Sequence, residues 1–139
     1  MVQIAELYSS LQGEGRLAGT PSVFVRTSGC NLRCTWCDTP FTSWKPTGTN
    51  RTVGDLVEEI LSHRLKHVVI TGGEPLLALD INVLCNILQH EGQHITIETA
   101  ATVIPDKGLP TANLMSLSPK LRSSTPNSET GWEQRHEKR

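Results

Sequence analysis

The sequence lacks long apolar runs, and no stretch approaches the roughly 20 apolar residues that a helix needs to cross a bilayer. Its opening segment, MVQIAELYSSLQGEG, also lacks the basic start and apolar stretch of a secretory signal. Neither sign of charge is in excess, because 13 Lys and Arg residues nearly balance 14 Asp and Glu residues. Composition therefore gives no electrostatic reason to expect nucleic acid or a membrane as a partner, and we expect a cytoplasmic protein.

The chain of 139 residues has the length of one typical domain, and it contains neither an internal repeat nor a linker that would separate two cores. Its last part, RSSTPNSETGWEQRHEKR, is mostly polar and charged and has no apolar periodicity. Such a composition is typical of disordered segments. We therefore expect one folded domain over residues 1–121, followed by a polar, disordered tail over residues 122–139.

Strand and helix patterns alternate along the middle of the chain. Short β-branched or apolar segments predict four strands, which begin at Ser22 and cover residues 67–71, 94–99 and 113–118. Apolar residues at helical spacing predict two intervening helices, over residues 52–63 and 80–90. This alternation is typical of an α/β protein with a parallel sheet, whose chemistry lies at the carboxyl ends of the strands. Four or five strands are too few to close a barrel, so we expect an open edge that a partner or the tail must cover.

Three of the four cysteines fall within the segment CNLRCTWCDT, after the first predicted strand. Clustered cysteines in a reducing compartment are more often metal or redox ligands than disulfides. A zinc site would normally use four ligands in two pairs, and Cys85 lies on the apolar face of a predicted helix, where we expect it to be buried. A cluster of four irons held by three thiolates leaves one iron open for a cofactor or substrate. We therefore predict an iron–sulfur cluster bound by Cys30, Cys34 and Cys37.

The cysteine spacing, followed by GGEP at residues 72–75, resembles the radical S-adenosylmethionine (SAM) superfamily. The resemblance implies an open, partial (β/α) barrel with a 4Fe-4S cluster on the three cysteines. It also implies that SAM binds the open iron and that one electron cleaves it to methionine and a 5′-deoxyadenosyl radical. We expect Gly72 and Gly73 to permit close approach of the methionine end of SAM.

More specifically, the segments ELYSSLQGEG, FVRTSGCNLRCTWCDT, VVITGGEPLL, IET and SLSPK resemble the 7-carboxy-7-deazaguanine synthase family of queuosine biosynthesis. The resemblance implies a lyase that uses SAM and Mg²⁺. Its reaction converts 6-carboxy-5,6,7,8-tetrahydropterin to 7-carboxy-7-deazaguanine with loss of ammonia. A homodimer is implied, together with an electron donor of the flavodoxin or ferredoxin type.

The resemblance also implies individual site residues. Substrate contacts are expected from Leu11, Gln12, Gly13, Arg26 and Thr71. SAM contacts are expected from Trp36, Cys37, Asp38, Gly73, Ser118, Pro119 and Lys120, and an oxygen ligand for Mg²⁺ from Thr39. A guanidinium at Arg26 suits the carboxylate of the pterin, because its planar donors match two carboxylate oxygens. No side chain is expected to act as a catalytic acid or base, because the radical itself abstracts the hydrogen atom.

Two features depart from this family. Ala100 and Ala101 stand where a polar residue and a glycine are usual, which is expected to disturb a turn near SAM. Family members also continue well beyond SPK with further strands and helices. We therefore expect a C-terminally truncated or divergent copy that holds the cluster and SAM but turns over poorly.

Two alternatives remain open from the sequence. One is another small radical SAM enzyme, such as an activase that places a glycyl radical on a partner. The other is a non-catalytic remnant that binds a cluster or zinc. The histidines show no metal-ligand spacing with the cysteines and are expected at the surface or at helix ends, at positions His63, His67, His90, His94 and His136.

Overall fold

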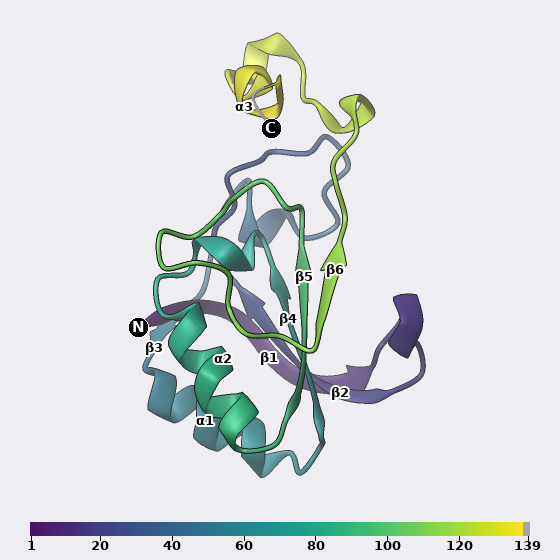
Figure 1. The fold of residues 1–139 in the computed structure, drawn as a ribbon. Helices are drawn as coiled ribbons and strands as arrows, with labels where there is room; N and C mark the ends of the chain where they lie inside the picture. Colours follow the sequence, from purple (N-terminus) through teal and green to yellow (C-terminus); the bar gives the residue numbers. More distant parts are fainter. Residues whose placement is uncertain (138–139) are drawn as a thin grey trace.

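The computed structural model describes residues 1–137 (Figure 1). Its strands are β1 Val2–Leu11, β2 Pro21–Thr27, β3 Thr49–Arg51, β4 His67–Gly72, β5 His94–Thr99 and β6 Leu114–Leu117. They form one sheet in the order β3-β1-β2-β4-β5-β6. The strands β2, β4, β5 and β6 run parallel, whereas β1 is antiparallel to both β2 and β3. The open, mostly parallel sheet confirms the predicted α/β class.

Two main helices, α1 Val53–Ser62 and α2 Ile81–His90, connect the parallel strands and lie on the same side of the sheet (Figure 1). The Thr52 side chain caps α1, since its Oγ1 accepts a hydrogen bond from the Asp55 amide at 3.1 Å. Short 3-10 helices occur at Gly15–Leu17, Pro40–Thr42, Pro75–Leu77, Arg122–Ser124 and Ser128–Thr130, and a short helix α3 at Glu133–Glu137. None of the helices within residues 1–137 is both long and apolar enough to span a membrane.

Alternate residues of the central strands build the core. Val25, Ile70 and Ile97 are fully buried and belong to one apolar cluster with helix residues such as Leu56 and Leu84. Because side chains along a strand alternate between the two faces of a sheet, the intervening residues point to the side that the helices leave uncovered. One face of the sheet therefore packs against the helices, and on the opposite face Arg26, Thr71 and Glu98 line a cavity.

The predicted helices and strands are confirmed to within about two residues at their ends, which is the usual uncertainty of such boundaries. The strands β1 and β3 were not predicted. In β1 the regular alternation of buried and exposed residues ends after Ile4, so the sequence there has no clean strand pattern. These two strands extend the sheet on the antiparallel side of β2.

The expectation of surface histidines is wrong for His67, which is only 3% exposed. Its Nδ1 lies 2.7 Å from the Ser22 hydroxyl, which donates to the Thr20 carbonyl and must therefore accept from Nδ1–H. Its Nε2 lies 2.8 Å from the Thr96 hydroxyl and accepts from it. These two bonds fit a neutral imidazole that ties three neighbouring strands together at their amino ends.

Residues 122–137 turn back over the loop that follows β2 (Figure 1). His136 is 1% exposed and lies in the last turn of α3, so it is not at the surface but fits the other expected place, a helix end. Its Nε2 accepts a hydrogen bond from the Arg33 amide at 2.9 Å. Polar composition gave no sign of these contacts. The boundary after residue 121 stays a prediction, and residues 138–139 of the predicted tail lie outside the described part of the chain.

Candidate active site

The cysteines lie on a loop that leaves the carboxyl end of β2 and is tied to the end of β4. The Gly73 amide donates to the Thr27 carbonyl at 3.2 Å, and the Glu74 amide donates to the Gly29 carbonyl at 2.9 Å. Within the loop, the Gly29 amide donates to the Thr42 carbonyl at 2.9 Å. The loop is thus closed on itself and fastened to the neighbouring strand, as a ligand-binding loop at this edge of a parallel sheet requires.

Cys30, Cys34 and Cys37 line one cavity of about 350 Å³. The Leu32 amide donates to the Cys30 sulfur at 3.4 Å, and the Ser43 hydroxyl lies 3.3 Å from the Cys37 sulfur. Burial raises the pKa of the Cys30 thiol, and the nearby Glu74 raises it further. A thiolate at Cys30 therefore needs a compensating positive charge, which a bound metal supplies.

This donor set fits an iron–sulfur cluster better than a single metal ion. Among residues 1–137, no three Cys, His, Asp or Glu side chains are grouped as one metal ion requires. Cys85 is fully buried in the core, as predicted, and burial raises its pKa to about 12. Three thiols around one cavity match a cluster, whose ligands attach at separate corners. Cys30, Cys34 and Cys37 could therefore hold a 4Fe-4S cluster.

A second cavity, of about 490 Å³, lies on the open face of the sheet. Its lining includes Gln12 and Gly13 from the end of β1 and its loop, Arg26 from β2 and Thr71 from β4. It shares its boundary with the cysteine cavity through Asp38, Thr39, Gly72, Gly73, Ala100 and Lys120. A ligand in the second cavity and a ligand beside the cysteines would therefore share these boundary residues as contacts.

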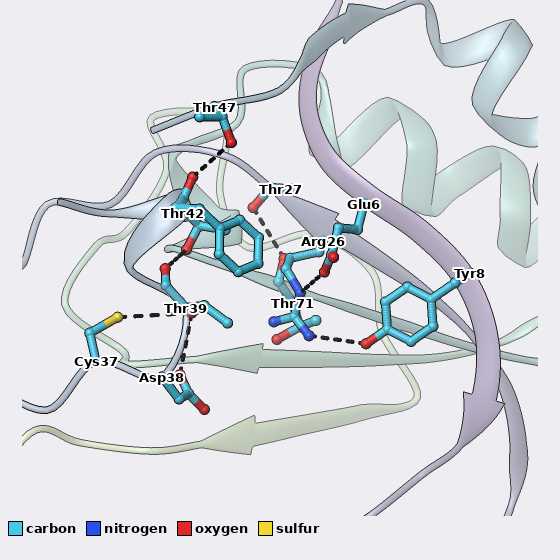
Figure 2. Close-up of polar contacts among 11 residues, drawn as sticks. Glu6, Tyr8, Arg26, Thr27, Cys37, Asp38, Thr39, Thr42, Thr47 and Thr71 are labelled. Carbon is cyan, nitrogen blue, oxygen red and sulfur yellow. Dashed lines mark hydrogen bonds and ion pairs between the residues drawn. The ribbon is translucent and has the colours of Figure 1, made fainter. Parts of the chain in front are cut away.

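Arg26 is held in place by the antiparallel strand β1. Its Nε donates to Glu6 Oε2 at 2.9 Å, and its Nη2 donates to the Tyr8 hydroxyl at 3.0 Å (Figure 2). Tyr8 in turn stacks on Phe24, with ring centroids 5.3 Å apart. Arg26 and Thr71 are register partners on adjacent strands and lie together in Figure 2. A guanidinium has five N–H donors, so Arg26 can bind a carboxylate while these two bonds fix its orientation.

Residues 24–110 match the family model of the Radical SAM superfamily. The chain belongs to the radical SAM superfamily. Membership implies a 4Fe-4S cluster and SAM as cofactors, in agreement with the three thiols around one cavity. The expected partial barrel of the radical SAM type is also confirmed, because the chain resembles the crystal structure of QueE from Escherichia coli. That match has a TM-score of 0.72 and 33% identity, and it covers 86% of this chain and 60% of that chain.

Curated relatives carry the name of the family that the motifs indicated. The 7-carboxy-7-deazaguanine synthase of Rhodopirellula baltica is 56% identical over 126 residues, which cover 91% of this chain and 48% of the relative. That of Halobacterium salinarum is 52% identical over 143 aligned residues, which cover 98% of this chain and 54% of the relative. The chain spans about half the length of these relatives. The second match also includes most of residues 122–139, so the family resemblance extends beyond SPK.

The structure of this superfamily member brings most of the predicted site residues together. Trp36, Cys37, Asp38, Gly73 and Lys120 line the cysteine cavity, and Gln12, Gly13, Arg26, Thr71 and Ser118 line the second cavity. The Thr39 hydroxyl lies between Cys37 and Asp38, 3.3 Å from Asp38 Oδ1 (Figure 2). Leu11 and Pro119 are exposed and line neither cavity. The individual roles of all these residues stay predictions.

The two glycines of GGEP have a structural reason in addition to the expected approach of SAM, which stays a prediction. A Cβ on Gly72, whose φ is +132°, would lie 2.5 Å from the Thr27 amide nitrogen and would also meet the Thr27 carbonyl oxygen. A Cβ on Gly73 would meet the Gly29 carbonyl and would lie 2.8 Å from the Thr42 carbonyl oxygen. The absence of side chains therefore permits close approach between β4 and the cysteine loop, whether or not SAM is bound.

Two carboxylates of the site were missed by sequence reasoning. Glu74 is 1% exposed, and its carboxylate accepts from the Thr99 hydroxyl at 2.7 Å, the Leu76 amide at 3.1 Å and the Ala100 amide at 3.0 Å. Glu98 Oε1 accepts from Gln12 Nε2 at 2.9 Å. Both glutamates lie inside the motifs GGEP and IET, which could have drawn attention to them. Apart from the Leu76 amide, their partners lie 25 or more positions away along the chain, so the sequence could not indicate them.

Ala101 adopts a φ of +58°, a left-handed conformation that favours glycine. The expectation that a glycine is usual at this position fits that geometry. The turn nevertheless forms, because the Ala101 amide donates to the Thr99 hydroxyl at 3.0 Å and Thr99 is itself held by Glu74. The alanine therefore adds local strain without preventing the turn.

Proposed function

We propose that this chain provides the catalytic core of a 7-carboxy-7-deazaguanine synthase. The reaction would convert 6-carboxy-5,6,7,8-tetrahydropterin to 7-carboxy-7-deazaguanine with loss of ammonia. The observation that carries the proposal is the junction of two cavities, one lined by three cysteines and the other by Gln12, Arg26 and Thr71. The identity of 52–56% to two synthases of that name supports the choice of substrate.

The cluster, when bound, supplies the electron that cleaves SAM to a radical able to abstract a hydrogen atom from the substrate. The protein would hold and orient both molecules. In this proposal Trp36, Asp38 and Gly73 contact SAM beside the cysteines, and the segment Ser118–Pro119–Lys120 contacts it from the end of β6. The Lys120 ammonium, 2.9 Å from the Ser118 hydroxyl, lies on both cavities and adds a positive charge for an anionic group.

On the substrate side, Arg26 would bind the carboxylate of the pterin. The bonds from Glu6 and Tyr8 hold its guanidinium before the substrate arrives, which lowers the entropic cost of binding. Leu11, Gln12, Gly13 and Thr71 would complete the contacts, partly through backbone groups. Orientation is the main contribution that the protein can make to a reaction whose hydrogen transfer is carried out by a radical.

Mg²⁺ would be held by the Thr39 hydroxyl together with substrate oxygens and water. Magnesium binds hard oxygen ligands and keeps several waters, so a single protein oxygen is sufficient. The position of Thr39 on the boundary of the two cavities supports this assignment. The proposal also includes a cytoplasmic location, a homodimer, and an electron donor of the flavodoxin or ferredoxin type.

The test is an anaerobic assay of the chain reconstituted with iron and sulfide. Incubation with SAM, a low-potential reductant, Mg²⁺ and the carboxypterin should give 7-carboxy-7-deazaguanine, detected by mass spectrometry, and omission of Mg²⁺ should reduce the yield. Arg26→Gln should raise the KM for the carboxypterin tenfold or more, because a charge-assisted bond of about 1.5–3 kcal/mol is lost.

Other outcomes distinguish the alternatives. A fully loaded sample that cleaves SAM but forms no deazaguanine would contradict the synthase activity and favour another radical SAM reaction, such as that of an activase. A colourless sample that contains zinc and no sulfide would instead favour a non-catalytic remnant.

A further inference from the structure

Arg33 is a buried cation next to the cysteine ligands. Its residue is only 9% exposed, and its Nη1 donates to the Cys30 carbonyl at 2.8 Å and to the Leu32 carbonyl at 2.7 Å. These bonds hold the guanidinium against the backbone of the cysteine loop. Burial lowers the pKa of Arg33, whereas the nearby Cys30 and Cys37 raise it. None of the salt bridges found within residues 1–137 involves Arg33. A buried guanidinium without a carboxylate partner is costly unless another anion lies nearby.

The C-terminal segment, residues 122–137, holds Arg33 in this position. The Arg33 Cζ lies 3.8 Å from the ring centroid of Trp132, which is a cation–π contact. Arg135 also contacts this ring, at 4.7 Å, and the His136 imidazole accepts from the Arg33 amide at 2.9 Å. The aromatic ring therefore excludes water from the guanidinium and keeps its charge in a medium of low dielectric.

Further bonds fasten the same segment to the cysteine loop. The Thr35 amide donates to the Ser124 carbonyl at 3.0 Å, and the Thr35 hydroxyl donates to the Thr125 carbonyl at 3.1 Å. The Trp36 indole N–H donates to the Ser123 carbonyl at 3.3 Å. The segment thus contacts the loop on both sides of Cys34.

We propose that Arg33 balances the negative charge of the iron–sulfur cluster and raises its reduction potential, and that Trp132 is the positioning residue that keeps the guanidinium there. Reduction adds an electron to a cluster already surrounded by thiolates. A fixed cation nearby therefore favours the reduced form, and burial strengthens the effect because solvent screens it less. The proposal rests on the cluster implied by the superfamily and not on the carboxypterin reaction, so failure of the synthase assay would leave it standing.

The reduction potential of the cluster tests this inference directly. The full chain and its variants are reconstituted with iron and sulfide, and a low-potential one-electron reductant is titrated while the reduced cluster is followed by EPR. In Arg33→Gln the ratio of reduced to oxidised cluster at a fixed potential should fall about tenfold, which is about 59 mV for a one-electron couple. Arg33→Lys keeps the charge and should shift the ratio much less. Arg64→Gln removes an exposed guanidinium just before β4, at the opposite end of the sheet, and should leave the potential unchanged.

Trp132 variants test the positioning role. Trp132→Ala should lower the ratio in the same direction as Arg33→Gln, because water then reaches the guanidinium. Trp132→Phe retains an aromatic face and should stay closer to the unmodified chain. Equal potentials for Trp132→Ala and the unmodified chain would refute the role of Trp132.

Three results would overturn the role of Arg33. The first is an unchanged potential in Arg33→Gln, and the second is a shift in Arg33→Lys as large as that in Arg33→Gln. The third concerns iron and sulfide content, measured for every sample. If Arg33→Lys and Arg33→Gln both fail to take up the cluster, the side chain shapes the loop and its charge is not the cause. Loading of Arg33→Lys but not of Arg33→Gln would support the inference, because only the charge is then retained.

Discussion

Glu74 offers the sharpest test of how the ends of β4 and β5 are joined. Its buried carboxylate accepts three hydrogen bonds, from the Thr99 hydroxyl and from the amides of Leu76 and Ala100. These bonds fix GGEP against ETAAT, and both segments border the two cavities. We predict that Glu74→Gln and Glu74→Ala destabilise the fold in that order.

The magnitudes follow from the donors that each change leaves without an acceptor. Gln keeps one oxygen but places an NH₂ group opposite one of the three donors, so one bond to a charged group is lost, at a cost of about 2 kcal/mol. Ala removes the acceptor from all three donors. Each buried donor without a partner costs about 1–3 kcal/mol, and the sum is partly offset because the buried charge is also removed, so we expect about 3–5 kcal/mol. A loss of that size is a large fraction of the stability of a typical domain, about 5–15 kcal/mol.

The assay is urea unfolding followed by circular dichroism, under anaerobic and reducing conditions. Glu58→Gln is the matched control, because Glu58 is exposed on α1 and its replacement should change the free energy of unfolding by less than about 0.5 kcal/mol. If Glu74→Gln were as stable as Glu58→Gln, the three hydrogen bonds would not be what joins the two strand ends, and the reasoning would be refuted.

Three further predictions concern the backbone and a buried imidazole. Ala101→Gly should stabilise the fold by about 0.5–1 kcal/mol, because it relieves the left-handed conformation at φ +58°, and a denaturation midpoint that fell would contradict this. Gly73→Ala should destabilise it by more than about 2 kcal/mol or prevent folding, because its Cβ meets backbone oxygens. A Cβ on Gly54 in α1 would make only an ordinary contact, 3.8 Å from Thr52 Oγ1, so Gly54→Ala should be neutral or slightly stabilising in the same unfolding assay. Burial, and then the neighbouring His94, lower the pKa of His67 below its ordinary value of about 6.5, so the unfolded chain binds the proton more readily and stability is lost as the pH falls below about 6.5. His67→Gln should flatten that loss in unfolding curves measured from pH 7.5 to pH 5, and an unchanged slope would exclude His67 as its source.

Local sequence patterns were sufficient to predict the two main helices and the parallel strands. The apolar faces of α1 and α2 repeat at helical spacing, and β4 and β5 are short apolar runs bounded by glycine or polar residues. Each of these signals lies within about ten neighbouring residues, so it can be read without knowledge of the fold. The strand β1 has no such signal along much of its length, because part of its outer edge pairs with β3 and its exposed face takes part in the site.

The candidate site likewise combines residues that local sequence predicted with contacts that it could not predict. Cys30, Cys34 and Cys37 are close along the chain, and their spacing alone predicted a shared iron–sulfur cluster. The hydrogen bond between Gln12 and Glu98 joins residues 86 positions apart, and the contact of His136 with Arg33 spans 103 positions. No local pattern carries information about such pairs.

The order of residues alone therefore indicated the chemistry of this chain, because the cysteine spacing and the glycine-rich turn each lie within a few neighbouring positions and can be identified from residue type. The pairing of strands and the return of residues 122–137 over the cysteine loop decided which groups surround the site residues. Those contacts bring the Thr99 and Ala100 donors to Glu74 and the Trp132 ring to Arg33. Burial and electrostatic environment arise from groups that meet only after the chain has folded, and for that reason composition alone pointed to a disordered tail where the structure has buried contacts.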